Sequence, residues 1–309
     1  MHESGLLAHI FGRSRDLAAA FPHVLVGPGD DCAVVAAPGG AALLLKVDQL
    51  IEHRHFAPGT ALDMVARKAL ARGLSDIAAM AGTPLAGLAA AALPAGFPQG
   101  RANELFDAAN HWSRVFGCPL VGGDIAAFAE PSAPITLSIT IIGLPHARRG
   151  PVLRSGAKVG DAVYVTGAIG GSLDVATGGG RHLTFEPRLR EAAWLADSQG
   201  HDLHALMDIS DGLGLDAGRL AQASAVAIDI DARAVPLAPG AGPVEKALAD
   251  GEDYELLFTV DHSAHVPKLC PMTGTAVTRI GTVTAGSGCV MVMQDGARRD
   301  ITGMGFEHR

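Results

Sequence analysis

The sequence predicts an α/β protein of the α+β type that is built as two domains. A chain of 309 residues, 48% of them hydrophobic, is long and apolar enough for two cores. Strand-like runs and helical stretches are mixed in both halves of the chain, separated by turns rich in glycine and proline. A polar, helix-breaking connector follows residue 144. We therefore expect an N-terminal domain over residues 1–145 and a C-terminal domain over residues 146–309.

The first half contains two strand patterns and two helix patterns. The run that begins at Ala41 is apolar and stops at Asp48, and residues 134–143 alternate Thr and Ser with Ile and Leu. Apolar residues recur at spacings of three and four over residues 62–80 and 101–116, and both stretches stop next to a glycine. The order strand, helix, helix, strand is typical of a mixed α/β unit.

The second half repeats this mixture after the connector at residues 145–151. A short strand is expected at Ala162 to Thr166, and further strands at residues 228–232 and 254–260. One helix is expected to begin at Pro187, since proline suits the first turn, and another near Asp211. The C-terminal domain is therefore also expected to be a mixed α/β unit.

Charge and composition exclude several classes of protein. The formal charge of −8 argues against nucleic-acid and membrane-surface partners, which favour basic proteins. The four cysteines show no Cys-x-x-Cys spacing, so a disulfide scaffold and a zinc site are not expected. Neither a signal peptide nor an apolar run long enough to cross a bilayer is present in the sequence. We expect a cytoplasmic protein.

Acidic residues recur beside glycine or serine in segments that are far apart in the sequence. These segments are Gly29-Asp30-Asp31, Ser75-Asp76, Gly122-Gly123-Asp124, Asp208 to Gly212 and Gly251-Glu252-Asp253. Each one alone is typical of a turn or a helix cap, whereas Asp48 and Asp124 follow apolar runs and are expected at strand ends. If the fold gathers these acids, they would repel one another without cations. Oxygen ligands of this kind suit Mg²⁺ and a phosphorylated ligand.

Standard nucleotide-binding signatures do not occur in the sequence. It lacks a Gly-x-x-x-x-Gly-Lys-Ser/Thr phosphate loop and a Gly-x-Gly-x-x-Gly dinucleotide fingerprint. It also lacks a Gly-x-Ser-x-Gly nucleophile turn. Phosphate chemistry in this chain must therefore use another architecture.

Together these motifs resemble the thiamine-monophosphate kinase family. The resemblance rests on Gly29 to Ala33, Asp48 with His55-Phe56, Leu74 to Met80, Gly122 to Asp124, Arg154 to Ala157, Tyr164 to Gly167, Asp208 to Leu213 and Gly251 to Leu256. It implies the two-domain fold shared with aminoimidazole ribonucleotide synthetase. It also implies a homodimer formed through the N-terminal sheet, with ATP and metals bound between subunits and domains.

The resemblance implies a division of labour among the site residues. Several Mg²⁺ ions would be held by Asp31, Asp48, Asp76, Asp124, Asp208 and Asp211, with Asp30 beside them. ATP would contact Gly123, Asp124, Arg154 and Ser210, and thiamine phosphate would contact His55, Glu252 and Phe306. Direct in-line transfer would give thiamine diphosphate and ADP without a catalytic nucleophile, because positioning and charge neutralisation dominate phosphoryl transfer.

The chain departs from the family pattern next to these positions. Val47 replaces a threonine, Gly73 an asparagine, Ile125 a threonine, Asp250 a glycine and His53 a glycine. Val47 offers no hydroxyl, and His53 adds bulk beside His55. Two alternatives therefore stay open: a paralogue whose altered pocket phosphorylates another small metabolite, and a non-catalytic nucleotide-binding protein.

Overall fold

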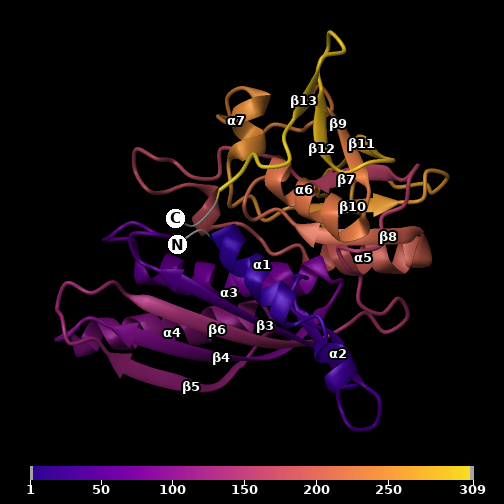
Figure 1. The fold of residues 1–309 in the computed structure, drawn as a ribbon. Helices are drawn as coiled ribbons and strands as arrows, with labels where there is room; N and C mark the ends of the chain where they lie inside the picture. Colours follow the sequence, from indigo (N-terminus) through magenta and orange to yellow (C-terminus); the bar gives the residue numbers. More distant parts are fainter. Residues whose placement is uncertain (1–2, 307–309) are drawn as a thin grey trace.

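A six-stranded sheet with two long helices on one face forms the N-terminal half (Figure 1). The computed structural model describes residues 3–306. The sheet has the order β1-β2-β3-β6-β4-β5 and consists of β1 (Val24–Val26), β2 (Ala33–Ala36), β3 (Ala42–Ile51), β4 (Thr83–Leu93), β5 (Leu120–Ala127) and β6 (Thr136–Leu144). The helices of this half are α1 (Glu3–Arg13), α2 (Leu17–Ala20), α3 (Leu62–Ala79) and α4 (Gln99–Val115).

The two faces of this sheet differ in burial. Leu137, Ile139 and Ile141 alternate along β6, are buried, and share one core cluster with residues of α3 and α4. The opposite face is open, and Val47 on β3 keeps 61% of its surface exposed there. All neighbours in the sheet pair antiparallel except β4 and β5, which are parallel. The sheet therefore has one helix-covered face and one exposed outer face.

A seven-stranded sheet organises the C-terminal half, in the order β13-β12-β9-β11-β7-β10-β8. Its strands are β7 (Ala162–Thr166), β8 (Leu203–Asp208), β9 (Ala227–Asp231), β10 (Leu256–Val260), β11 (Val277–Thr284), β12 (Gly288–Val292) and β13 (Arg298–Asp300). The helices are η1 (Arg181–Leu183), α5 (Leu189–Gln199), η2 (Gly200–Asp202), α6 (Leu213–Ser224) and α7 (Val244–Ala249). Strands β9 and β12 pair parallel and the others antiparallel.

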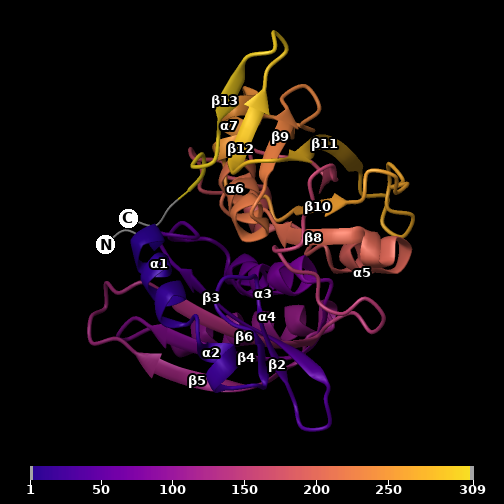
Figure 2. The same cartoon turned by 45° about the vertical axis from the view of Figure 1, so that its right-hand side comes forward.

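Helix α3 lies between the two halves, which stand one above the other in Figure 2. Ala78 and Ala81, at the end of α3, are buried in one cluster with Leu195 of α5 and Leu256 of β10. The domain interface is therefore a packed apolar core. It fixes α3 relative to the C-terminal sheet, and α3 carries several of the residues discussed below.

The α/β class is confirmed, with one mixed sheet in each half of the chain. The boundary at residue 145 stays a prediction; β6 ends at Leu144 and β7 begins at Ala162. Among residues 3–306, no helix is long and apolar enough to cross a membrane.

Three local expectations were wrong. Ser75 and Asp76 lie inside α3 and not at a turn, because the helical periodicity continues through them. Asp48 and Asp124 lie within β3 and β5 and not at strand ends, since the strands continue past the acids. The strand β4 was also missed. The reason is that β4 is nearly half alanine and has no alternation of apolar and polar residues.

Candidate active site

Three buried carboxylates meet where the two domains join. Asp31 lies in the loop between β1 and β2, Asp76 in α3, and Asp208 at the end of β8. One carboxylate oxygen of each lies within 4.8 Å of those of the other two. Ser75 Oγ donates a hydrogen bond to Asp208 Oδ2 at 2.6 Å. Residues that are separated by up to about half the chain thus form one cluster, which we call the three-acid cluster.

The electrostatics of the three-acid cluster favour a bound cation. Burial, with the charge of Asp31 next, raises the pKa of Asp208 to about 7. Burial also raises the pKa of Asp76 well above its usual range, although Lys46 opposes this. Lys46 Nζ lies 2.6 Å from Asp76 Oδ1 and supplies one positive charge. Crowded, buried carboxylate oxygens of this kind fit the ligand preference of a hard divalent cation such as Mg²⁺.

Arg154 closes one side of this cluster from the loop between β6 and β7. Its guanidinium donates two hydrogen bonds to the Asp31 carboxylate, with Nε 3.1 Å from Oδ2. Its backbone N–H lies 3.2 Å from Asp30 Oδ2. Burial and the neighbouring Asp31 raise the pKa of Asp30 to about 6. Arg154 therefore lies next to the acids with a fork-shaped donor set that also suits phosphate oxygens.

Helix α3 presents a charged stripe to the site. Lys68, Arg72 and Asp76 follow one another at four-residue spacing, which places them on one side of the helix. Arg72 Nε lies 3.4 Å from Asp48 Oδ2, and Lys46 Nζ lies 3.6 Å from Asp48 Oδ1. Lys46 thus links the Asp48 carboxylate to Asp76, and Arg72 contacts Asp48 as well, so Asp48 lies at the edge of the three-acid cluster. Sequence reasoning missed Lys46, Lys68 and Arg72, although their spacing from Asp48 and Asp76 was a usable signal.

The Ser210-Asp211 segment lies at the start of α6. The backbone N–H groups of Ser210 and Asp211 donate to Asp216 Oδ2 at 3.0 and 2.9 Å. The Asp211 carboxylate pairs with Arg219 Nη1 at 2.5 Å and does not belong to the three-acid cluster. Asp216, which sequence reasoning missed, is buried, and burial raises its pKa to about 7. The carboxylates of Asp211 and Asp216 share Arg219.

Gly123 and Asp124 lie apart from the other predicted residues. They are on β5, an edge strand three strand spacings from β3, or about 14 Å. The register places Asp48 in one row with Gly123, so Asp124 points to the outer face, where it is exposed. A methyl group at Gly123 would lie 1.8 Å from the backbone oxygen of Ala89. The chain's own fold therefore requires glycine at position 123 and does not bring Asp124 to the three-acid cluster.

His55 and Glu252, two of the residues predicted to contact the substrate, meet at Lys68, at the opposite end of this charged stripe from Asp76. Lys68 Nζ lies 2.5 Å from Glu252 Oε2 and 2.7 Å from the backbone oxygen of His55. Phe306 donates its backbone N–H to the Asp211 oxygen, and the Arg54 guanidinium lies 4.6 Å from the centre of the Phe306 ring. Lys68 thus connects His55 with Glu252, whereas the backbone hydrogen bond to Asp211 holds Phe306 at the start of α6.

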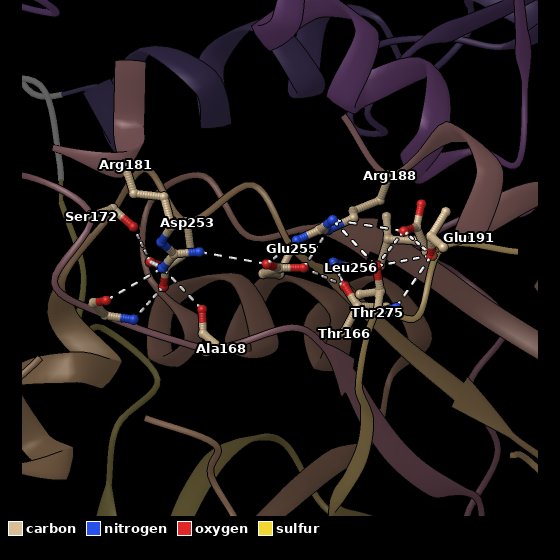
Figure 3. A network of polar contacts seen from close by, with 12 residues as sticks. Thr166, Ala168, Ser172, Arg181, Arg188, Glu191, Asp253, Glu255, Leu256 and Thr275 are labelled. Carbon is tan, nitrogen blue, oxygen red and sulfur yellow. Dashed lines mark hydrogen bonds and ion pairs between the residues drawn. The ribbon is translucent and has the colours of Figure 1, made fainter. Parts of the chain in front are cut away.

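A polar network fixes the backbone that follows Glu252 (Figure 3). Arg181 Nη2 lies 2.9 Å from Asp253 Oδ1. Arg188 donates to both oxygens of Glu255, at 2.7 and 2.6 Å. Glu252 itself has a φ of 64°, a left-handed conformation that is costly for a residue with a side chain. The surrounding ion pairs hold this conformation in place.

Comparisons with known proteins agree with the fold. The family model described as AIR synthase related protein, N-terminal domain, matches residues 29–144, and the C-terminal domain model matches residues 158–294. The class is therefore that of the AIR synthase related proteins.

Relatives of known name narrow the class. A thiamine-monophosphate kinase of Rhodopirellula baltica is 34% identical, with 99% of this chain and 97% of the relative covered. A thiamine-monophosphate kinase of Escherichia coli (strain K12) is 31% identical, with 99% and 98% covered. A solved structure of AaThiL complexed with AMPPCP and TMP has a TM-score of 0.81 and 29% identity, and covers 100% of this chain and 97% of that chain. This chain belongs to the thiamine-monophosphate kinase family.

Proposed function

We propose that the protein transfers the γ-phosphate of ATP to thiamine phosphate, with Mg²⁺, and yields thiamine diphosphate and ADP. The three-acid cluster carries the proposal, because Asp31, Asp76 and Asp208 come from both domains and form a buried oxygen site. The match to AaThiL in complex with AMPPCP, an ATP analogue, and TMP supports the same pair of substrates.

The residues of the proposed site form two groups, one that would bind Mg²⁺ and the phosphates of ATP and one that would bind the substrate. Asp31, Asp76 and Asp208, with Asp48 at their edge, would hold Mg²⁺, which would neutralise the phosphates. Arg154 would leave Asp31 to bind a phosphate oxygen, since its fork of donors fits either group. Glu252 and His55 would bind the substrate at the Lys68 end of the charged stripe of α3. The attack by a substrate phosphate oxygen on the γ-phosphorus then needs no protein nucleophile.

Two copies would associate through the outer face of the N-terminal sheet. Val47 and Leu88 expose 61% and 42% of their surface on this face, and β5 is a free edge. Asp124 points to this face, away from its own three-acid cluster, so it would serve the cluster of the second copy. A two-fold interface would give each site an Asp124 from the partner.

Mixed dimers test this arrangement. Asp124→Asn and Asp208→Asn should each abolish turnover in homodimers. After unfolding and refolding together in equal amounts, the mixture should regain about a quarter of the wild-type activity, because half the dimers are mixed and each has one intact site. A mixture that stays inactive while it refolds to dimers would show that Asp124 acts within its own chain.

The direct test of the proposed function is product formation. Purified protein should convert thiamine phosphate and ATP to thiamine diphosphate and ADP in the presence of Mg²⁺, measured by separation of the thiamine phosphates. EDTA should stop the reaction, and Asp76→Asn should abolish it without loss of the fold. ATP binding without turnover of thiamine phosphate would contradict the proposal and favour a non-catalytic nucleotide-binding protein.

One observation keeps a changed substrate as a second candidate. His53 has a φ of 67° in the turn that precedes His55, a conformation that glycine adopts at little cost. His53 is two residues before His55 in the same turn, so its imidazole would narrow or charge a substrate pocket formed by this turn. A comparison of thiamine phosphate with other small phosphorylated metabolites, by kcat/KM, decides between these substrates.

A further inference from the structure

A buried lysine on α3 lies behind the predicted substrate side of the site. The Lys68 side chain is 0% exposed, and its ammonium group lies next to three polar atoms. These are the His55 backbone oxygen at 2.7 Å, Glu252 Oε2 at 2.5 Å and His182 Nδ1 at 2.6 Å. An ammonium group has three donors, so the geometry saturates it. A lysine is rarely buried to this extent without such partners.

His182 completes this cluster from the C-terminal domain. Its Nδ1 lies 2.8 Å from Glu252 Oε2 as well as next to Lys68, and its side chain is 1% exposed. Its Nε2 lies 3.2 Å from the Gly178 oxygen. Gly178 in turn packs against Ala57, because a methyl group there would lie 2.6 Å from the Ala57 Cβ. The loop around His182 is therefore seated on the segment that follows His55.

Glu252 is the member of the cluster that reaches solvent. Its side chain is 24% exposed, whereas Lys68 and His182 are covered. Burial disfavours its ionised form, but the charge of Lys68 and the hydrogen bond that Lys68 donates outweigh burial and hold the pKa of Glu252 below its usual range. The carboxylate is thus ionised and held from behind by two side chains that no substrate would touch.

We infer that Lys68 and His182 are positioning residues that hold the Glu252 carboxylate and the His55 turn for the ring end of the phosphorylated substrate. Lys68 precedes Asp76 by eight residues on one rigid helix, a rise of about 12 Å. The helix would therefore set the distance between the ring contacts and the metal-binding end of the site. An ionised Glu252 suits a substrate with a cationic or N–H-bearing heterocycle. The inference rests on the proposed function.

Steady-state kinetics of Lys68→Met test the inference. We expect KM for thiamine phosphate to rise about tenfold or more, a change of about 1.4 kcal/mol, while KM for ATP stays near the wild-type value. His182→Gln should also raise KM for thiamine phosphate. Lys268→Met, at an exposed lysine away from the site, is the matched control and should leave both constants unchanged.

A double-mutant cycle separates positioning from a general effect on the fold. If Lys68 acts through Glu252, Lys68→Met should add little to the KM effect of Glu252→Gln, because the group it positions is already altered. The double variant also removes both buried charges and so keeps the test available if Lys68→Met alone does not fold. Additive effects, or equal increases of KM for both substrates, would overturn the positioning role. A wild-type protein that makes no thiamine diphosphate would overturn the proposed function instead.

Discussion

Asp208→Asn should stabilise the metal-free protein at neutral and higher pH. Burial and the charge of Asp31 raise the pKa of Asp208 from 3.8 to about 7. Between these two values the unfolded chain releases this proton and the folded protein keeps it, so the folded state loses stability as pH rises from about 4 to about 7. A difference of about three pKa units corresponds to about 4 kcal/mol. Asparagine at position 208 does not ionise, so the variant should not lose stability in this way as the pH rises.

The net gain in the free energy of unfolding from Asp208→Asn is smaller than the electrostatic contribution of about 4 kcal/mol. The amide would weaken the hydrogen bond that Asp208 accepts from Ser75, at a cost of about 1 kcal/mol. The remaining gain of about 3 kcal/mol should raise the unfolding temperature by roughly 6–12 °C at about pH 8 in EDTA. Below about pH 3 the electrostatic difference should vanish, because Asp208 is then protonated in both states, and only the hydrogen-bond cost of about 1 kcal/mol should separate the two proteins.

Excess Mg²⁺ should reverse this order. Wild-type protein gains stability as its three-acid cluster binds the cation, by about 4.1 kcal/mol at a thousandfold excess over Kd, which exceeds the gain of about 3 kcal/mol from Asp208→Asn. Asp208→Asn lacks one of the three ligands and should gain much less. Thermal unfolding followed by the fluorescence of Trp112 and Trp194, with EDTA or Mg²⁺ across the pH range, measures both effects. A variant with the wild-type pH dependence, or with the wild-type response to Mg²⁺, would refute the reasoning.

Three further substitutions test individual contacts. Val47→Thr should leave turnover and the number of bound Mg²⁺ ions unchanged, because the side chain at position 47 points to the outer face; a rise in turnover would show that the hydroxyl reaches a metal. His53→Gly should change the free energy of unfolding by less than about 1 kcal/mol, because relief of the left-handed backbone offsets the entropy of glycine, while kcat/KM for thiamine phosphate rises; a lower kcat/KM would contradict this. Lys46→Met removes the cation beside Asp76, so it should lower the unfolding temperature in EDTA and enlarge the rise in unfolding temperature that Mg²⁺ produces. An unchanged rise with Mg²⁺ would argue against a shared electrostatic site.

The sequence predicted the members of the three-acid cluster but not the whole site. The acidic segments were visible in the sequence, but Asp31, Asp76 and Asp208 were assigned to the metals, with Asp48, Asp124 and Asp211, only through the resemblance to the thiamine-monophosphate kinase family. The position of Asp124 could not be predicted, because its face depends on pairing with strands that lie far away in the sequence. Lys68 was missed for a different reason. Lysines are expected at the surface, and only its spacing from Asp76 on α3 pointed to the site.

The packed domain interface explains how three like charges remain close together. Two ionised carboxylates 4.8 Å apart repel by about 3 kcal/mol at the effective dielectric of a protein, which is comparable to the pKa shift of Asp208. Ala78 and Ala81 of the N-terminal half are buried in one apolar cluster with Leu195 and Leu256, and this contact opposes the repulsion. Because Asp208 and Asp76 come from different domains, their repulsion acts directly against this interface. Cation binding at the three-acid cluster and closure of the two domains are therefore expected to be coupled, so that each stabilises the other.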